Sequence, residues 1–467
     1  MLQWFKVWKR GGLSRVVGLA LLELMLVCAL GGRVRAAERP NIMLVVADDL
    51  GYGDTGFNGC RDIPTPALDH FADEGVIFSN GYVPGAVCAP SRAGMLTGRY
   101  PERIGAQQNP PYAPDDPTVG VPLSEPFMAA PLQDTGYRTG AIGKWHVGSH
   151  PQFHPNRRGF DFFYGFLHGG HRYWPAEYPE WREKIDDKSP AYAYVTPLER
   201  NGKPVKESGY LTDILTREAV HFIETSDDQP FFLYLAYNAP HVPMEARPED
   251  LEALAGIKDD KRRTYAAMVM ALDRGVGQIR KALERTGRLD STWVVFLSDN
   301  GGLPRHGASN HPLRGNKNTV WEGGVRVPMF FRPAAAAADS MPVGTVYPHT
   351  VSALDFYPTF LALAGAPAPA GKTLDGINLL PYLRDGTDPR EDIPLFVSPH
   401  HVRRPACRGV RLNDWKALSN RGGPWGLFNL REDIGERNNL SKAKPGKLDA
   451  LRERFEAWSE KNMEPRW

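Results

Sequence analysis

Cysteine is scarce in this sequence, and neither sign of charge dominates it. The 467 residues include four cysteines and no C-x-x-C pair, which is too few for a disulfide framework and lacks the spacing of a structural zinc site. The formal net charge of +2 gives no argument for nucleic acid as a partner. Glycine and proline follow no period, which excludes a collagen-like chain, and we find no internal repeat. With 42% hydrophobic and 24% charged residues, the sequence predicts a globular protein that is neither disordered nor multi-spanning.

The first 36 residues have a composition of their own. They carry six basic side chains and one acid, Glu23, and an apolar run covers residues 16–30 before the short sequence Val34-Arg35-Ala36. This order is typical of a secretory signal peptide. An uncleaved membrane anchor is the alternative, but the run is shorter than the roughly 20 residues that a span requires, and it contains an acid. We therefore predict a signal peptide over residues 1–36, no stable membrane insertion after cleavage, and export to the periplasm, the extracellular space or a lysosome.

Apolar runs and helical patterns alternate along the middle of the chain. Three apolar runs suit strands that are buried on both faces of a parallel sheet, at residues 41–48, 231–237 and 293–298. Helical spacing occurs at residues 66–74, 212–225, 259–285 and 351–363. Strands that alternate with helices predict an α/β protein with crossover connections. The length predicts two or three domains, or one large domain with a smaller one.

The pattern changes toward the C-terminus. A helical pattern at residues 128–134 contains Pro131, which should kink or shorten the helix, and residues 108–126 and 333–340 are predicted to be surface loops. Short extended pieces then occur at residues 393–398, 409–412, 415–418 and 427–430, before a closing helix at residues 447–458. We therefore predict a large α/β domain over residues 37–385 and a small α+β domain over residues 386–467.

Acidic residues follow two of the predicted strands. Asp48-Asp49 come after the first strand and Asp299-Asn300 after the third, at the strand ends where α/β sheets place their sites. A solvated loop is the simpler interpretation of one such pair, but the repetition favours a shared site. Four oxygen ligands suit a hard divalent cation such as Ca²⁺.

The glycine-rich stretch at residues 51–56 fits G-x-G-x-x-G. We reject a dinucleotide site there, because the two preceding carboxylates would repel a pyrophosphate and no helical pattern begins at Gly56.

The segment Cys88-Ala89-Pro90-Ser91-Arg92 is the most informative in the chain. Continued to Arg99, it resembles the C-x-P-S-R motif of the type I, formylglycine-dependent sulfatases, a family of the alkaline phosphatase superfamily. In that family a maturation enzyme oxidises the cysteine to Cα-formylglycine during export. A buried, inert cysteine is the alternative interpretation. Removal of the signal peptide would take Cys28 away and leave Cys88 with only Cys60 and Cys407.

Five further segments resemble motifs of that family in the same order along the chain. They are residues 48–54, 143–148, 239–243 and 298–301, and Lys317 with residues 321–324. Val147 is the one departure, at a position where leucine is commoner. The resemblance covers nearly all of residues 38–440. It implies a large mixed, mostly parallel sheet sandwiched by helices, with a small C-terminal α+β domain.

The resemblance also implies a mechanism for sulfate ester hydrolysis. Hydrated formylglycine at residue 88 would present two hydroxyls: one attacks sulfur, and deprotonation of the other expels sulfate and restores the aldehyde. The implied ligands of one Ca²⁺ per chain are Asp48, Asp49, Asp299, Asn300 and the side chain of residue 88, formed from Cys88. Asp299 would also take the attacking proton.

Five other side chains receive roles from the same resemblance. Arg92 would hold the side chain of residue 88, and Lys144 and Lys317 would bracket the sulfate. His146 would assist the elimination, and His241 with Lys317 would protonate or stabilise the departing oxygen. A structural pairing is the alternative for each residue taken alone.

Candidate substrate-binding residues lie in two loops, where specificity is expected to reside. One loop carries His168, His171, Arg172, Tyr173 and Trp174, and the other carries His306, His311 and Arg314. Aromatic and cationic groups of this kind suit a sulfated carbohydrate, and packed surface loops are an equal alternative. The basic residues His400, His401, Arg403 and Arg404 are predicted to form a solvated face.

Two other functions stay open on the sequence alone. A phosphonate or phosphodiester hydrolase of the same superfamily can share the nucleophile motif and an oxygen-rich metal site. A protein that binds sulfated glycans without conversion of Cys88 is the alternative from another class. The intact acids and the two lysines favour the sulfatase over both.

Overall fold

The computed structural model describes residues 39–177, 194–398 and 407–467. The chain divides into two units, Met1–Arg39 and Pro40–Trp467. The predicted signal peptide, residues 1–36, and the basic residues His400, His401, Arg403 and Arg404 lie outside the described residues. None of the helices in the described ranges is long and apolar enough to span a membrane.

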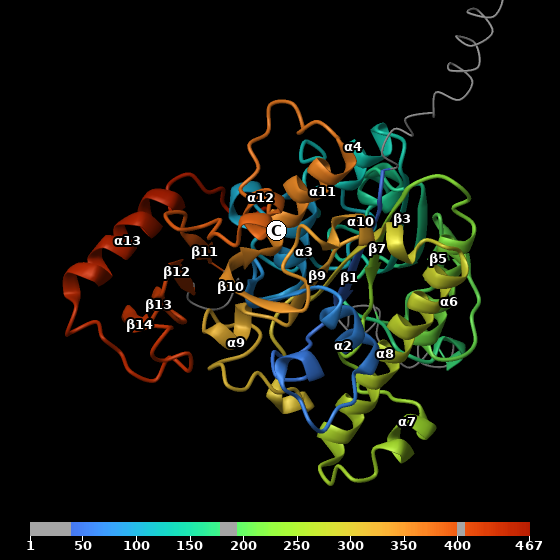
Figure 1. Cartoon of the computed structure of the whole chain (residues 1–467), viewed down its shortest axis with the longest axis horizontal. Helices are drawn as coiled ribbons and strands as arrows, with labels where there is room; N and C mark the ends of the chain where they lie inside the picture. Colours follow the sequence, from blue (N-terminus) through green and yellow to red (C-terminus); the bar gives the residue numbers. More distant parts are fainter. Residues whose placement is uncertain (1–38, 178–193, 399–406) are drawn as a thin grey trace, which may run out of the picture. The chain divides into compact units, whose positions relative to one another are not determined.

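A ten-stranded mixed sheet forms the centre of the second unit (Figure 1). Its strands, in spatial order, are β10 (Thr345–Ser352), β2 (Val76–Tyr82), β9 (Met329–Arg332), β8 (Thr292–Ser298), β1 (Asn41–Ala47), β7 (Phe231–Ala236), β3 (Arg138–Lys144), β4 (Phe162–Phe166), β5 (Leu198–Arg200) and β6 (Lys203–Val205). The five strands from β8 to β4 pair in parallel. Strand β9 is antiparallel to both of its neighbours, and β5 and β6 pair antiparallel at the other edge.

Strand β1 shows why the central strands are apolar throughout. Ile42, Leu44 and Val46 belong to one hydrophobic cluster, and the alternate residues Met43 and Val45 belong to another. Successive side chains of a strand point to opposite faces of the sheet, so β1 is buried on both faces.

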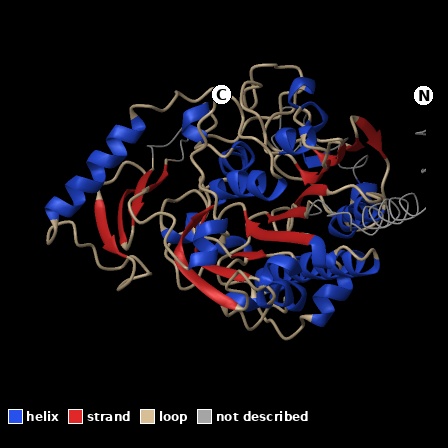
Figure 2. Ribbon diagram, turned by 45° about the horizontal axis from the view of Figure 1, so that its top comes forward, coloured by secondary structure: helices blue, strands red, loops and turns tan. Residues whose placement is uncertain are grey.

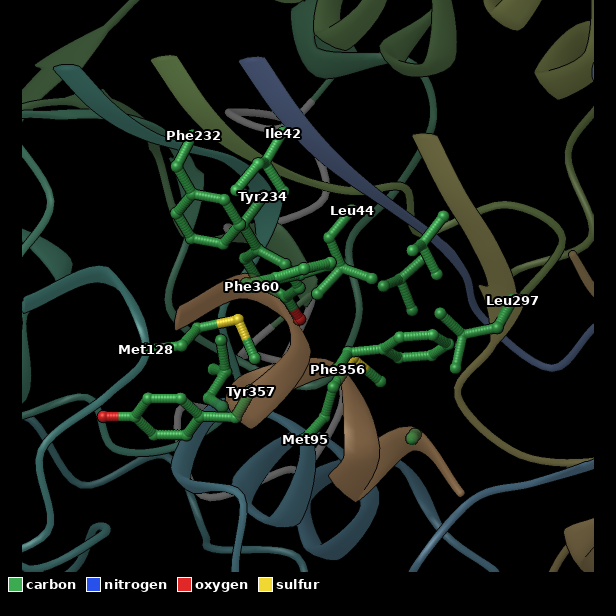
Figure 3. Packing of buried hydrophobic residues seen from close by; sticks show 14 of the residues in the cluster. Ile42, Leu44, Met95, Met128, Phe232, Tyr234, Leu297, Phe356, Tyr357 and Phe360 are labelled. Atoms are coloured by element: carbon green, nitrogen blue, oxygen red, sulfur yellow. The ribbon is translucent and has the colours of Figure 1, made fainter. Parts of the chain in front are cut away.

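Helices cover both faces of this sheet. One face packs against α3 (Cys88–Thr97), α4 (Ala129–Asp134), α11 (Phe356–Ala364) and α12 (Leu380–Asp385). The other packs against α2 (Pro66–Asp73), α6 (Leu211–Glu224), α7 (Pro248–Ala253) and α8 (Asp260–Arg285). Figure 3 shows Met95 of α3 packed beside Phe356 and Tyr357 of α11 in the first cluster. The predicted fold class, an α/β protein with a large mixed sheet sandwiched by helices, is confirmed.

A second, antiparallel sheet follows near the C-terminus (Figure 2). It consists of β11 (Leu395–Val397), β12 (Arg408–Leu412), β13 (Trp415–Ser419) and β14 (Gly426–Asn429). Helix α13 (Pro445–Ser459) packs on one face, and the other face packs on Tyr82, Val320 and Val325 of the preceding chain. The predicted small α+β element is confirmed, and its boundary at residue 386 stays a prediction.

Two predicted elements differ from the structure in detail, and a third agrees with its prediction. The helix expected at residues 351–363 begins only at Phe356, because β10 runs through Ser352 and a capping box of Ser352 with Asp355 starts a 3₁₀ turn. The loop expected at residues 333–340 contains the four-residue helix α10 (Ala335–Ala338), consistent with the high helix propensity of alanine. Helix α4 is short, as Pro131 predicts, with six residues.

The remaining helices are short. They are α9 (Glu322–Val325) and the 3₁₀ turns η1 (Gly56–Asn58), η2 (Pro101–Ile104), η3 (Pro151–Phe153), η4 (Pro155–Arg157), η5 (Pro175–Glu177), η7 (Leu289–Ser291), η8 (Pro304–His306) and η9 (Ala353–Asp355).

Buried charges join the small sheet to the loop after Lys317. Lys416 Nζ in β13 lies 2.7 Å from Glu322 Oε1 and 3.0 Å from Glu436 Oε1. Glu436 Oε2 also accepts the backbone N–H of Glu322 at 2.7 Å. Burial raises the pKa of Glu436 to about 7, whereas Lys416 and Arg326 outweigh burial at Glu322 and lower its pKa to about 2. One lysine thus compensates a buried, ionised Glu322 and holds Glu436 beside it.

Candidate active site

The ends of β1 and β8 bring four of the five predicted metal ligands together, Asp48, Asp49, Asp299 and Asn300. The strands pair in parallel with Ala47 opposite Ser298, so the residues that follow meet at one edge of the sheet. Asp49 N donates to Asp299 Oδ1 at 3.3 Å, and Asn300 Nδ2 donates to Asp49 Oδ1 at 2.7 Å. Asp49 has φ +65°, a left-handed conformation that is costly for a residue with a side chain and is often found at functional sites.

Cys88 is the first residue of α3 and is buried. Its thiol lies 3.6 Å from Asp48 Oδ1, and Lys317 Nζ donates to its Sγ at 3.0 Å. Burial opposes ionisation of the thiol, but Lys144 and Lys317 outweigh burial and lower its pKa to about 6. A helix N-terminus also favours negative charge. The surroundings of residue 88 therefore stabilise an anion.

Arg92 lies one turn after Cys88 on the same helix and is fully buried. Its Nε and Nη2 lie 2.9 Å and 2.8 Å from Asp299 Oδ2. Its Nη1 donates to the carbonyl oxygen of Lys144 at 3.2 Å and to Tyr234 Oη at 3.3 Å. In this structure Arg92 orients Asp299 and ties α3 to the end of β3.

Lys144 and Lys317 approach the acids from two sides. Lys144 Nζ lies 2.5 Å from Asp48 Oδ2, and Lys317 Nζ lies 2.6 Å from Asp49 Oδ1. Burial alone would lower the pKa of each ammonium group, but Asp48 and Asp49 reverse that effect and both pKa values are raised. Both lysines are therefore cationic beside Cys88.

The pKa values of the two predicted catalytic histidines are shifted in opposite directions. His241 Nε2 lies 3.8 Å from Asp49 Oδ2. Burial disfavours its protonation, but Asp48 outweighs burial and its pKa is raised. His146 has φ +62°, and its Nδ1 has no hydrogen-bond partner among the described residues. Burial and Lys144 lower the pKa of His146 well below its usual value. His241 is thus the candidate acid and His146 the candidate base.

The donor set fits a hard cation. Oxygen, nitrogen and sulfur atoms of Asp48, Asp49, Cys88 and His241 lie within 4.8 Å of one another. Asp49 Oδ2 and Asn300 Oδ1 are buried and have no hydrogen-bond partner among the described residues. Such oxygens are costly unless something binds them, and carboxylate and amide oxygens are the ligands that Ca²⁺ prefers. The site can hold the predicted cation.

The residues of the first predicted substrate loop do not all lie at the site. His168 lies near the site, with its ring 5.7 Å from that of His146. His171 is fully buried, and its two ring nitrogens contact the carbonyl oxygens of Arg172 and Thr196.

The other three residues of this loop have partners of their own. Arg172 forms an ion pair with Glu245. Tyr173 and Trp174 pack on Tyr210 at 5.3 Å each. Within this loop, the ring of His168 lies beside that of His146, and Tyr173 Oη donates to the backbone carbonyl oxygen of His241 at 2.9 Å.

The second predicted substrate loop follows β8. His306 is half-buried in η8, and burial and Arg305 lower its pKa. Asp49, His241 and Lys317 of the site have smaller effects on that pKa. His311 and Arg314 are exposed and line a pocket on the same loop.

Three residues that the sequence analysis missed also contact the site. Tyr234 Oη accepts from Arg92, and Asn109 Oδ1 accepts the backbone N–H of Ala89 at 3.0 Å. The ring of Tyr194 lies 6.2 Å from that of His241. Tyr234 sits within an apolar strand pattern, where tyrosine is expected to be a core residue, so only its contact with Arg92 distinguishes it.

Comparison with known proteins agrees with this geometry. A family model described as Sulfatase matches residues 40–366, and the chain belongs to the sulfatase family. It is 34% identical over 445 residues to N-acetylgalactosamine-6-sulfatase of Mus musculus, covering 90% of this chain and 80% of the relative. It is 32% identical over 466 residues to Arylsulfatase J of Mus musculus, covering 90% and 75%.

A solved structure is also similar. The crystal structure of Ps i-CgsB in complex with k-i-k-neocarrahexaose matches with a TM-score of 0.87 and 46% identity, covering 92% of this chain and 94% of that one. The protein is a type I sulfatase of the alkaline phosphatase superfamily, and thus a sulfuric ester hydrolase.

Proposed function

We propose that this protein is an exported sulfatase that hydrolyses sulfate monoesters of a sulfated carbohydrate, using formylglycine made from Cys88 and one bound Ca²⁺. The observation that carries the proposal is the buried Cys88 Sγ, 3.0 Å from Lys317 Nζ and beside Asp48. A binding protein has no need to bury a nucleophile among cations and acids. Formylglycine hydrate at this position supplies a hydroxyl for attack on sulfur.

The surrounding side chains account for the other requirements of the reaction. Lys144 and Lys317 are cationic and can neutralise the sulfuryl oxygens. Asp299, oriented by Arg92, is placed to accept a proton. His146, neutral and with a free Nδ1 among the described residues, can accept the second proton. These contacts support the roles that we propose for the four side chains.

The leaving oxygen needs a proton when it belongs to a sugar alcohol. We expect His241→Asn to lower kcat about 100-fold or more with an alkyl or sugar sulfate, but much less with a nitrophenyl sulfate, whose leaving group departs without protonation. Steady-state kinetics on both substrates measures the difference. Equal losses on both would contradict the assignment of His241 as the leaving-group acid.

Binding of the cation can be tested by thermal stability, without a measurement of activity. Added Ca²⁺ is expected to raise the melting temperature of chelator-treated protein, because a ligand that binds only the folded state stabilises it. Asp49→Asn removes one carboxylate, and we expect it to need at least about tenfold more Ca²⁺ for the same shift. Asp62→Asn, an exposed acid outside the site, is the matched control. A shift that is the same in both variants would refute this ligand set.

The proposal of a sulfated carbohydrate substrate rests on similarity to known sulfatases. The 46% identical protein was crystallised with k-i-k-neocarrahexaose, and two mammalian relatives are named as sulfatases. The deciding experiment coproduces the protein with a formylglycine-forming maturation enzyme and examines Cys88 by peptide mass spectrometry. The matured protein is then incubated with a panel of sulfated glycans and with an aryl phosphodiester.

Three outcomes separate the candidate functions. Formylglycine with release of sulfate from a glycan supports the proposal. Faster turnover of the phosphodiester would favour the phosphodiester hydrolase. Unmodified Cys88 with glycan binding and no turnover would favour the binding protein.

A further inference from the structure

A pocket of about 520 Å³ lies next to the loops of the active site. Its titratable lining residues are His311, Arg314 and Arg437, and all three are exposed. No carboxylate among the described residues lines it. A neighbouring pocket of about 500 Å³ contains Arg61 and Arg262, but its lining also includes the carboxylate of Asp62, and Asp54 and Asp62 pair with Arg262. The first pocket is therefore the one that is suited to an anion.

The wall of this pocket is continuous with the active-site loops. Asn310 accepts the backbone N–H of Gly302 at 2.9 Å and donates to the Gly302 carbonyl oxygen at 3.0 Å. Gly302 is two residues beyond the predicted ligand Asn300. Arg314 precedes Lys317 by three residues, a separation of at most about 11 Å of extended chain. Neighbouring sugars of one glycan can bridge such a distance.

The C-terminal part of the chain supplies the opposite side of the pocket. Arg314 Nη1 donates to the Glu436 carbonyl oxygen at 2.7 Å, and its guanidinium stacks 3.7 Å over the Trp321 ring. Glu436 is itself held by the Glu322 backbone N–H and by Lys416. Arg437 follows directly, so it is carried by an anchored loop. A loop that is already anchored does not have to be ordered when a ligand binds, which lowers the entropic cost of binding.

We propose that this pocket binds a second sulfate group, on a sugar next to the one whose sulfate ester is cleaved. The inference rests on the proposed function and narrows its substrate to a carbohydrate chain with at least two sulfates. Arginine favours such a group because its planar fork of N–H donors matches two oxygens of an oxyanion. Residues of the loop after β8 and of the loop after β14 thus select the substrate.

The test compares two oligosaccharides of the same backbone, one singly sulfated and one sulfated on adjacent sugars. The ratio of kcat/KM for the doubly sulfated chain to that for the singly sulfated chain is the readout. We expect this ratio to fall about tenfold in Arg437→Gln, the effect of losing one charge-assisted hydrogen bond, and further in Arg437→Glu. Added NaCl should lower the wild-type ratio, because salt screens an exposed charge.

Arg431→Gln is the matched control, because Arg431 is exposed, lies outside the pocket and pairs with Asp414. Its ratio should equal that of the wild type. An unchanged ratio in both Arg437 variants, with normal turnover, would overturn the inference and leave the proposed function standing. If the matured wild type cleaved neither oligosaccharide, the proposed function would fail. Calorimetry of the doubly sulfated chain with Cys88→Ala and Cys88→Ala/Arg437→Gln would then test the pocket, and equal affinities would overturn it.

Discussion

Replacement of Cys88 by alanine is expected to lower kcat for sulfate esters by at least about a thousandfold, since alanine can form neither a nucleophile nor formylglycine. The fold should persist, because the side chain becomes smaller by one sulfur atom at the start of α3 and the helix keeps its buried face. Kinetics on an aryl sulfate and a hydrazide probe for the aldehyde measure the two consequences on the same samples.

Cys60→Ala serves as the control for that experiment. Cys60 is only partly buried, and its Sγ contacts Asp62 Oδ1 at 3.2 Å, away from the predicted catalytic residues. Its replacement should leave both the aldehyde signal and the rate unchanged. Residual turnover above about a tenth of the wild-type rate in Cys88→Ala would show that another group attacks sulfur, since loss of a nucleophile costs far more.

Replacement of Lys416 by methionine is expected to lower the free energy of unfolding by about 3–5 kcal/mol, the usual effect of removing one partner of a buried ion pair. Lys416 is 3% exposed and contacts Glu322 and Glu436, which are both fully buried. Without the ammonium group, Glu436 must be protonated or left without a cation, and Glu322 keeps its ion pair with Arg326. Denaturant unfolding monitored by tryptophan fluorescence measures the loss.

Two further variants isolate the cause of this loss. Lys416→Met/Glu436→Gln removes the carboxylate that is left without a cation and should recover part of the stability. Lys444→Met removes an exposed lysine whose Nζ lies 5.7 Å from the Trp415 ring, and it should cost no more than about 1 kcal/mol. A loss in Lys416→Met as small as that in Lys444→Met would show that the buried charges do not join the small sheet to the Lys317 loop.

In the large sheet, the strands that the sequence predicted are those buried on both faces; the short pieces predicted near the C-terminus became β11 to β14 of the small sheet. Strands β1, β7 and β8 are nearly continuous apolar runs because each contributes to two hydrophobic clusters. Strand β3 was missed, although it lies beside β7, because it contains Gly140 and Gly143. A Cβ at Gly140 would lie 2.7 Å from the Phe222 ring. Close packing against α6 therefore selects glycine where a strand pattern would show an apolar side chain.

The short strands β5, β6 and β9 of the large sheet were not predicted, for a different reason. Strands β5 and β6 have three residues each, too few for a periodic pattern. They form because β4 offers an edge with which to pair, and the position of that edge depends on the order of strands in the sheet. The same applies to β9, a four-residue strand held between β2 and β8.

The sequence by itself determined the family of this protein, because the segments that resemble sulfatase motifs occur in a specific order along the chain. Only the tertiary structure decided which side chains touch one another. Arg92 contacts Asp299, 207 positions away along the chain, and Arg314 meets the loop that carries Arg437 across 122 positions. Contacts of this kind depend on the strand order and on the packing of two sheets, which no local pattern of residues encodes.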